Sequence, residues 1–273
     1  MGRNIAKDRY GKNPAKIPSS ITSKNYVTTS QIDGRVVWRL YPKNSNSEII
    51  ILYLHGGAYH ASITSLHWTL ITKLLEKTGA AIIVPDYPLA PQSTCKETYL
   101  FLDELYEKIL GKYHSKRIIF IGDSAGGGLA FGFAQQLRNE GKIQPEHIIL
   151  YSPWLDASMN NPKLKELESI DKILNLKGLR EAGENYAGSI EINDFKVSPL
   201  FGELQGLGKI SIFSGTDDLL NADAKRLKEK AEEADICLNF FEYNGMFHDW
   251  MLVPFLGATH DVVHKTARLT KTS

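Results

Sequence analysis

The sequence has few cysteines and no long apolar run. Its two cysteines, Cys95 and Cys237, lie too far apart for a zinc knuckle, a redox pair or a secreted disulfide framework, so a cytoplasmic location is predicted. No apolar run approaches the length that spans a bilayer. The basic, polar N-terminus predicts neither a secretory signal nor a membrane anchor.

An excess of charge of either sign is also missing. The chain carries 32 Lys and Arg residues against 31 Asp and Glu residues, which gives a formal charge of +1. Such a balance supplies no field that would recruit nucleic acid or an anionic surface. We therefore expect no nucleic-acid partner, and binding that depends on local contacts. The oligomeric state is left open, and a homodimer is one option.

Motifs for metals and phosphates are missing as well. His55, His60 and His67 lie close together, but their spacing lacks the i, i+4 helical pair and the attendant glutamate of a zinc protease. The glycine-rich segment after residue 121 has no Lys-Ser/Thr pair, which a P-loop requires. We expect neither a metal nor a cofactor.

Short apolar runs alternate with longer amphipathic stretches through most of the chain. Runs such as IIILYL (49–54) are apolar on successive residues, as are strands that are buried on both faces of a parallel sheet. We expect strands at 35–41, 48–54, 80–87, 117–122, 147–153, 209–215 and 236–243, and helices near 65–78, 94–110, from 125, 221–234 and 259–270. This order predicts an α/β fold with a mostly parallel central sheet and helices on both faces.

Two segments depart from the alternation. Residues 1–30 have little apolar periodicity and are interpreted as an N-terminal arm, with a contribution to a cap left open. Residues 156–198 are polar and helical, without a convincing strand, and are interpreted as a small helical cap inserted over one end of the sheet. The core would then comprise residues 31–155 and 199–273.

A glycine-rich turn follows the expected strand at 117–122. Residues 122–126, GDSAG, match the G-x-S-x-G nucleophile elbow, here between a buried strand and a helix-forming run. Such a turn exposes its serine at a helix N-terminus, where the helix dipole favours developing negative charge. Ser124 is therefore the predicted nucleophile.

A serine nucleophile needs a base, and a carboxylate must hold that base in one tautomer. His248 follows the last expected strand, and either Asp217 or Asp218 follows the strand before it. The order Ser, Asp, His along the chain is that of α/β-hydrolases. On the residues alone, both aspartates are candidates for the acid.

The stretch HGGAYH (55–60) ends an apolar strand in backbone that is almost free of side chains. Acyl transfer needs N–H donors for the oxyanion, and the backbone after an early strand supplies them in this architecture. The N–H groups of Gly57, Ala58 and Ala125 are the predicted donors. Gly56 would allow the tight turn.

Several separated segments resemble the hormone-sensitive-lipase family of α/β-hydrolase esterases, in particular its bacterial carboxylesterases. HGGAY is similar to the family's His-Gly-Gly-Gly motif, PDYPLAP to its Asp-Tyr-x-Leu-Ala-Pro segment, and GDSAGG to its nucleophile motif. YSPWLD, SPLFGEL, SGTDDLL and GMFHDW also resemble family segments, and together the matches run from about residue 49 to residue 250.

The resemblance implies roles for individual residues. The family's acid lies in an Asp-x-Leu pattern that maps to Asp217, and its histidine maps to His248. His55 is implied to brace the oxyanion loop. The chain departs from the family at Ala58, which replaces a third glycine, at Gln92, which replaces an acidic residue, and in a shorter N-terminal region. Residues 156–198 would then form most of the cap, with His60 in polar packing under it.

These inferences predict a serine carboxylesterase for small to medium uncharged esters with short acyl chains. The predicted apolar pocket consists of Tyr59, Trp154, Met159, Phe201, Met246 and Phe247. Two alternatives stay open. An amidase or arylformamidase would use the same apparatus, and a non-catalytic ligand receptor on this fold is disfavoured because His248 is present.

Overall fold

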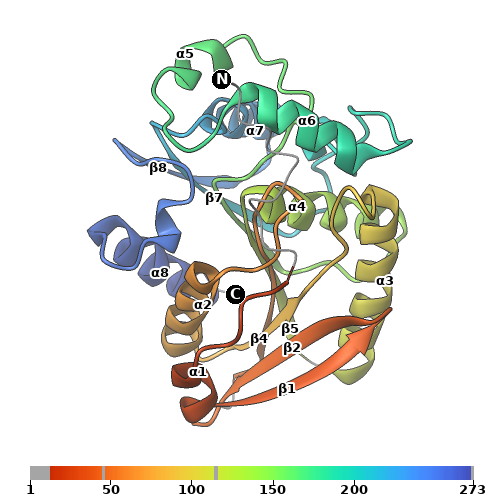
Figure 1. Ribbon diagram of the computed structural model, residues 1–273, viewed down its shortest axis with the longest axis vertical. Coiled ribbons are helices and arrows are strands. Elements are labelled where there is room, and N and C mark those ends of the chain that lie inside the picture. Colours follow the sequence, from red (N-terminus) through yellow and green to blue (C-terminus); the bar gives the residue numbers. More distant parts are fainter. Residues whose placement is uncertain (1–12, 45–46, 114–115, 272–273) are drawn as a thin grey trace.

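An eight-stranded sheet organises the protein in the computed structural model, which describes residues 13–44, 47–113 and 116–271 (Figure 1). The strands are β1 (Asn25–Ile32), β2 (Arg35–Pro42), β3 (Ile49–Leu54), β4 (Ala81–Pro85), β5 (Arg117–Asp123), β6 (His147–Tyr151), β7 (Lys209–Gly215) and β8 (Leu238–Tyr243). They lie in the order β1-β2-β4-β3-β5-β6-β7-β8. The first two pairings are antiparallel and the remaining ones are parallel, so the predicted mostly parallel sheet is confirmed.

Strand β3 shows why the central strands are apolar throughout. Every residue of β3 is buried. Leu52 belongs to one apolar cluster, whereas its neighbours Ile51 and Tyr53 belong to a second cluster on the opposite face. Because successive side chains of a strand point to opposite faces, a sheet that is covered on both sides requires an apolar residue at each position.

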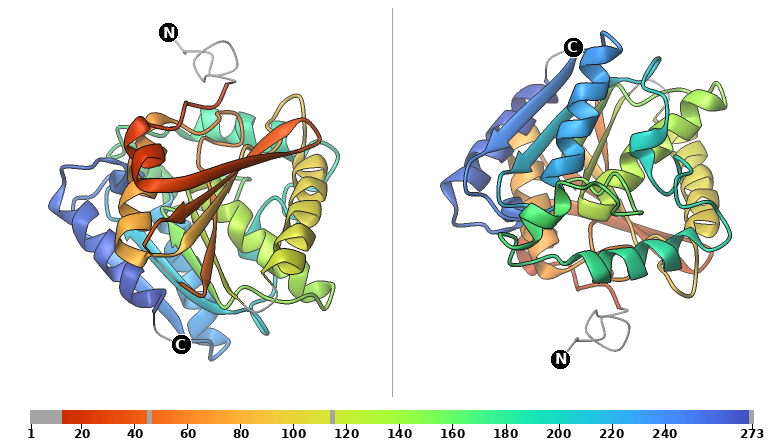
Figure 2. Two further views of the ribbon diagram at one scale, coloured as in Figure 1. Left: turned by 90° about the horizontal axis from the view of Figure 1, so that it is seen from below. Right: turned by 90° about the horizontal axis from the view of Figure 1, so that it is seen from above.

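Helices cover both faces of the sheet. One face is covered by α3 (Cys95–Lys112), α4 (Ser124–Asn139) and α7 (Asn221–Glu233), and the other by α1 (Ser19–Lys24), α2 (Ser65–Thr78) and α8 (Gly257–Leu269). Figure 2 (left) shows the sheet between these layers. Helix α2 begins after a capping box formed by Thr64 and His67 and ends at Gly79, which has a φ of 67°.

The insertion predicted at 156–198 carries helices α5 (Leu164–Glu168) and α6 (Leu176–Ala187) and no strand. Both helices lie at the top of Figure 1. Asp171, between them, accepts a hydrogen bond of 2.7 Å from the N–H of Leu219, in the turn that follows β7. The insertion is thereby fastened to the end of the sheet where the parallel strands finish.

Part of the predicted N-terminal arm is helix and strand, since α1 and the start of β1 lie within residues 1–30. Residues 1–12 lie outside the described residues. The N–H of Ala15 donates to the carbonyl of Ile63, and the carbonyl of Ala15 accepts the indole N–H of Trp68. The boundary predicted at residue 31 is wrong, because it falls inside β1 (25–32). The sequence pattern misses β1 because an edge strand buries little of its length and here contains Thr, Ser and Gln.

Two leucines of α3 provide a matched test of this core. Leu102 is fully buried, whereas Leu100 is 60% exposed. We expect Leu102→Ala to lower the free energy of unfolding by about 2 to 5 kcal/mol, because it removes buried apolar atoms and leaves a cavity. Leu100→Ala should change it by less than about 0.5 kcal/mol. Urea unfolding of both variants measures the difference, and equal losses would contradict the assigned faces of α3.

Candidate active site

The turn between β5 and α4 presents Ser124. Its φ of 50° lies in the left-handed region, which is strained for a residue with a side chain. A Cβ atom on Gly126 would lie 2.1 Å from the carbonyl oxygen of Leu54, and one on Gly122 would lie 2.2 Å from that of Gly126. Only glycine fits at both positions, and this close packing fixes the serine at the N-terminus of α4.

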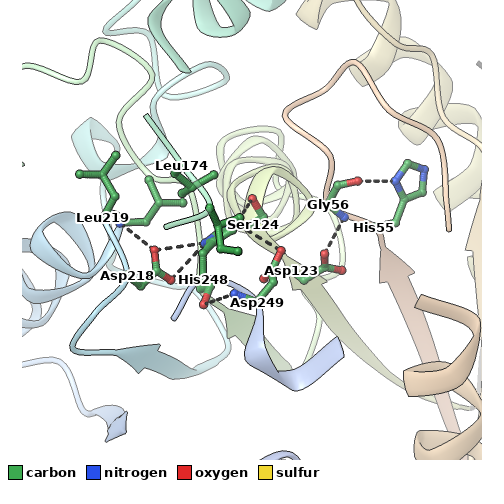
Figure 3. A network of polar contacts seen from close by, with 12 residues as sticks. His55, Gly56, Asp123, Ser124, Leu174, Asp218, Leu219, His248 and Asp249 are labelled. Carbon is green, nitrogen blue, oxygen red and sulfur yellow. Dashed lines mark hydrogen bonds and ion pairs between the residues drawn. The ribbon is translucent and has the colours of Figure 1, made fainter. Parts of the chain in front are cut away.

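His248 connects Ser124 to a buried aspartate (Figure 3). Its Nε2 lies 2.9 Å from the Oγ of Ser124, and its Nδ1 lies 3.1 Å from each carboxylate oxygen of Asp218. All three residues are buried. The row of contacts has the geometry of a nucleophile, a base and the carboxylate that orients the base.

Asp217 is not the partner of His248, so the prediction made from the Asp-x-Leu pattern is wrong. Its carboxylate accepts a hydrogen bond from the neighbouring Thr216 hydroxyl, and its N–H donates to the carbonyl of Met246 at 3.0 Å. The tight turn after β7 directs successive side chains to different sides. Asp218 points inward, and its carboxylate also accepts the N–H of Leu220 at 2.9 Å.

The loop after β3 has backbone that few side chains tolerate. Gly57 has a φ of 119°, and Ala58 and Tyr59 have φ values of 53° and 60°. A Cβ on Gly57 would lie 2.8 Å from the carbonyl oxygen of Ala61. Ala58, where the family has glycine, accepts a left-handed conformation at a cost of about 1 to 2 kcal/mol.

The three predicted oxyanion donors have N–H groups available to a ligand. Within the described part of the chain, no hydrogen bond uses the N–H of Gly57 or Ala58. Ala125 lies in the first turn of α4, where backbone N–H groups have no partner inside the helix. A developing oxyanion beside Ser124 could therefore be stabilised by backbone donors and by the dipole of α4.

Asp123, which precedes the serine, anchors this loop and was not singled out by the sequence reasoning. Its carboxylate accepts the N–H of Gly56 at 2.8 Å and the hydroxyl of Tyr53 at 2.5 Å, and it contacts Nε2 of His67 at 3.2 Å. Burial would raise the pKa of Asp123, but the imidazole of His67 and the hydrogen bonds keep it below its usual value. The N–H of Thr64 donates to Nδ1 of His67, which leaves the ring proton on Nε2, facing Asp123.

His55 braces the same loop, as the resemblance implies. Its Nδ1 lies 2.8 Å from the carbonyl oxygen of Gly56, and its ring stacks on Tyr87 with centroids 4.4 Å apart. The Tyr87 hydroxyl donates to the carbonyl of His55 at 2.6 Å. Burial and the neighbouring His67 lower the pKa of His55 to about 4, so the ring is neutral and its Nδ1–H donates to Gly56.

A second carboxylate, which the sequence pattern does not predict, lies beside His248. The Oδ2 of Asp249 lies 3.2 Å from Nε2 of His248, the same nitrogen that contacts Ser124. Burial would lower the pKa of His248, but the carboxylates of Asp249 and Asp218 raise it well above its usual value. Adjacency in sequence gave no signal, because the residue after a histidine has no fixed direction until the backbone is known.

A hollow lies between the loop after β3 and helix α6. It encloses about 550 Å³, including space that is open to solvent, and its lining consists of Ala58, His60, Ile173, Leu174, Asn175, Gly178, Leu179, Glu181, Ala182 and Asn185. His60 spans it, since its Nδ1 donates to the carbonyl of Ala58 at 2.8 Å and its Nε2 lies 3.4 Å from the amide nitrogen of Asn185. Both contacts of His60 are polar, and the second is with helix α6 of the segment predicted as a cap.

None of the six predicted pocket residues lines this hollow. Tyr59, Trp154 and Met159 are buried in the core, where Tyr59 stacks on Tyr186 with centroids 3.6 Å apart. Met246 and Phe247 pack against the apolar cluster on the α2 and α8 face.

Phe201 does not line the hollow either. Its ring is 41% exposed and lies under the guanidinium of Arg226, away from the hollow. Aromatic and Met residues at strand ends are apolar enough for either a core or a pocket, and packing alone decides between them.

The described residues contain no group of three or more His, Cys, Asp or Glu side chains that could hold a metal ion. They also contain no helix that is both long and apolar enough to cross a membrane.

The chain is similar to known proteins in sequence and in structure. A family model described as the alpha/beta hydrolase fold matches residues 51–252. An esterase of Acinetobacter venetianus is 33% identical over 205 residues, which cover 74% of this chain and 68% of that protein. An acetyl-hydrolase of Streptomyces hygroscopicus is 30% identical over 73% of this chain and 67% of its own length. The crystal structure of a hormone-sensitive lipase from a metagenome library superposes with a TM-score of 0.84 and 26% identity, over 90% of this chain and 85% of that one.

Replacement of Gly56 tests the anchoring of the loop by Asp123. A Cβ atom at Gly56 would lie 2.3 Å from the Asp123 oxygen that accepts the N–H of the same glycine, whereas a Cβ atom at Gly111 in α3 would meet open space. We expect Gly56→Ala to lower the free energy of unfolding by about 2 kcal/mol or more, because this buried hydrogen bond to a charged group is displaced. Gly111→Ala should leave stability unchanged or slightly raised. Thermal or urea unfolding gives both values, and an unaffected Gly56→Ala protein would contradict the anchor.

Proposed function

The chain belongs to the alpha/beta hydrolase fold family and is a carboxylic ester hydrolase of the hormone-sensitive-lipase type, and from this premise we propose that it hydrolyses small to medium uncharged esters with short acyl chains through a Ser124 acyl-enzyme. The observation that carries the proposal is the row of contacts from Ser124 through His248 to Asp218. Nucleophile, base and orienting carboxylate are within hydrogen-bond distance of one another before any substrate is bound.

In the first half of the reaction, His248 Nε2 takes the proton of Ser124 as Oγ attacks the ester carbonyl carbon. Asp218 accepts the Nδ1–H of the resulting imidazolium and stabilises its charge. The N–H groups of Gly57, Ala58 and Ala125 donate to the oxyanion. The bond to the alcohol oxygen then breaks, the alcohol leaves with the proton from Nε2, and the acyl group stays on Ser124.

In the second half, water replaces the alcohol. His248 removes a proton from the water as its oxygen attacks the acyl carbon, and the same backbone donors stabilise the second oxyanion. The bond to Oγ breaks, Ser124 regains its proton from Nε2, and the carboxylic acid leaves. Each half therefore uses the same nitrogen in turn as base and as acid.

The hollow under α6 supports the proposed substrate class; its lining includes Ala58 of the loop after β3 but not Ser124 or His248. Its apolar walls include Ile173, Leu174 and Leu179, and its lining contains no Lys or Arg among the described residues. A negatively charged substrate would find no cation there, whereas an uncharged ester could bury its apolar part.

Exchange of the two adjacent aspartates for asparagine tests the assignment of the acid. Asp218→Asn should lower kcat by about 10⁴-fold, because an amide cannot hold His248 in the tautomer that accepts the serine proton. Asp217→Asn should keep a kcat close to that of the wild type, since its carboxylate contacts Thr216 and not the imidazole. Steady-state hydrolysis of p-nitrophenyl acetate by the two variants decides, and a larger loss in Asp217→Asn would reverse the assignment.

A panel of p-nitrophenyl esters tests the substrate class. We expect acetate and butyrate to be hydrolysed with a higher kcat/KM than esters of long acyl chains, and Ser124→Ala to lose turnover by about 10⁶-fold because the nucleophile is gone. Matched esters and anilides, compared by kcat/KM, separate an esterase from an amidase. Equal turnover by the wild type and Ser124→Ala would refute the mechanism.

A further inference from the structure

The imidazole of His248 has a carboxylate at each of its two nitrogens. Asp218 lies 3.1 Å from Nδ1, and Asp249 lies 3.2 Å from Nε2. The Ser124 hydroxyl lies 2.9 Å from the same Nε2. Two groups therefore compete for the nitrogen that has to accept the serine proton, because a ring nitrogen offers one hydrogen-bonding direction.

A count of protons limits what the contact with Asp249 can be. When Asp218 accepts a hydrogen bond from Nδ1, a neutral imidazole has a lone pair on Nε2. An ionised carboxylate only accepts hydrogen bonds, so it would be repelled by that lone pair. The contact is favourable only if a proton lies between Asp249 and His248, on the carboxyl oxygen or on Nε2.

The surroundings of Asp249 favour this shared proton. Its side chain is 15% exposed, and its Oδ1 has no hydrogen bond within the described residues. A buried carboxylate oxygen without a donor is costly when it carries charge and much less so when the group is neutral. Burial raises the pKa of Asp249 to about 6, with His248 opposing that rise and Asp123 adding to it.

The backbone holds Asp249 in this place. It has a φ of 54°, a left-handed conformation that aspartate tolerates, and its N–H donates to the hydroxyl of Ser152 at 3.3 Å. The other titratable groups around the pair come from separate elements, namely Asp218 after β7, Asp123 at the end of β5, Tyr53 in β3 and His67 in α2.

We propose that Asp249 shares a proton with the base nitrogen of His248, and that departure of this proton to solvent converts the resting site into the state in which Nε2 accepts the proton of Ser124. The proposal rests on the proposed role of His248 as base. The pair then titrates as a unit. The fall of activity at low pH, the acidic limb of the pH profile, therefore reports protonation of the Asp249–His248 pair and not of an isolated imidazole.

The direction of the effect follows from charge. A carboxylate beside Nε2 stabilises the protonated ring, so its removal lowers the pKa of His248 and moves the acidic limb to lower pH. An opposite charge at this distance shifts a pKa by about 1 to 3 units. Suppose that the midpoint of the variant lies one pH unit below that of the wild type. At the midpoint of the variant, the variant retains half of its plateau activity, whereas the wild type retains about one tenth of its own, a difference of about five-fold.

The experiment compares pH profiles of kcat/KM for the wild type, Asp249→Asn and Asp249→Gly, with Asp217→Asn as the control. Asparagine and glycine both accept the left-handed backbone at this position, so the variants keep the fold of the turn. The rate at which a fluorophosphonate labels Ser124, measured over the same pH range, reports the base without any choice of ester.

We expect both Asp249 variants to move the acidic limb to lower pH in both measurements, and Asp217→Asn to leave it in place. Limbs that coincide with the wild type in both Asp249 variants would overturn the proposal. Its failure differs from failure of the proposed function. If only the proton-sharing proposal fails, Ser124→Ala is inactive and the acidic limb of the Asp249 variants stays at the wild-type pH. If the proposed function fails, Ser124→Ala still hydrolyses the ester.

Discussion

The buried carboxylate of Asp123 fastens the elements of the active site to one another. It belongs to the last residue of β5, and it binds the N–H of Gly56 in the loop after β3, the hydroxyl of Tyr53 in β3 and the ring of His67 in α2. A buried charge needs such a set of donors, because an unpaired one would destabilise the fold. Loss of any donor would therefore disturb the turn that carries Ser124, the proposed nucleophile.

Close backbone packing also holds the active-site elements together, in addition to the hydrogen bonds of Asp123. Gly126 in α4 lies against the carbonyl of Leu54, so the start of the helix and the end of β3 approach to a distance that no side chain permits. Ser124 and the loop with the proposed oxyanion donors are thereby held in one rigid arrangement. Preorganised donors of this kind stabilise charge without reorganisation at the moment of reaction.

His248 contacts one carboxylate more than an arrangement of nucleophile, base and orienting acid requires. Three carboxylates, those of Asp123, Asp218 and Asp249, gather near the imidazoles of His55, His67 and His248 in a largely buried region. In the proposed proton-sharing, the number of protons in this region would decide which hydrogen bond His248 makes, because burial penalises each unpaired charge. Local backbone geometry places the carboxylates, and the tertiary structure couples them.

The sequence by itself determined the α/β fold and singled out Ser124 and His248 as the proposed nucleophile and base, because apolar runs and a glycine-bracketed turn depend on local sterics and burial. It also determined the glycines of the loop at 56–57, whose backbone angles exclude other residues. Only the tertiary structure decided four other features. They are the choice between Asp217 and Asp218, the pairing of edge strand β1, the walls of the hollow, and the contact of Asp249 with His248. In each of these cases adjacent or similar residues differ in direction, and direction is set by packing between segments distant in the chain.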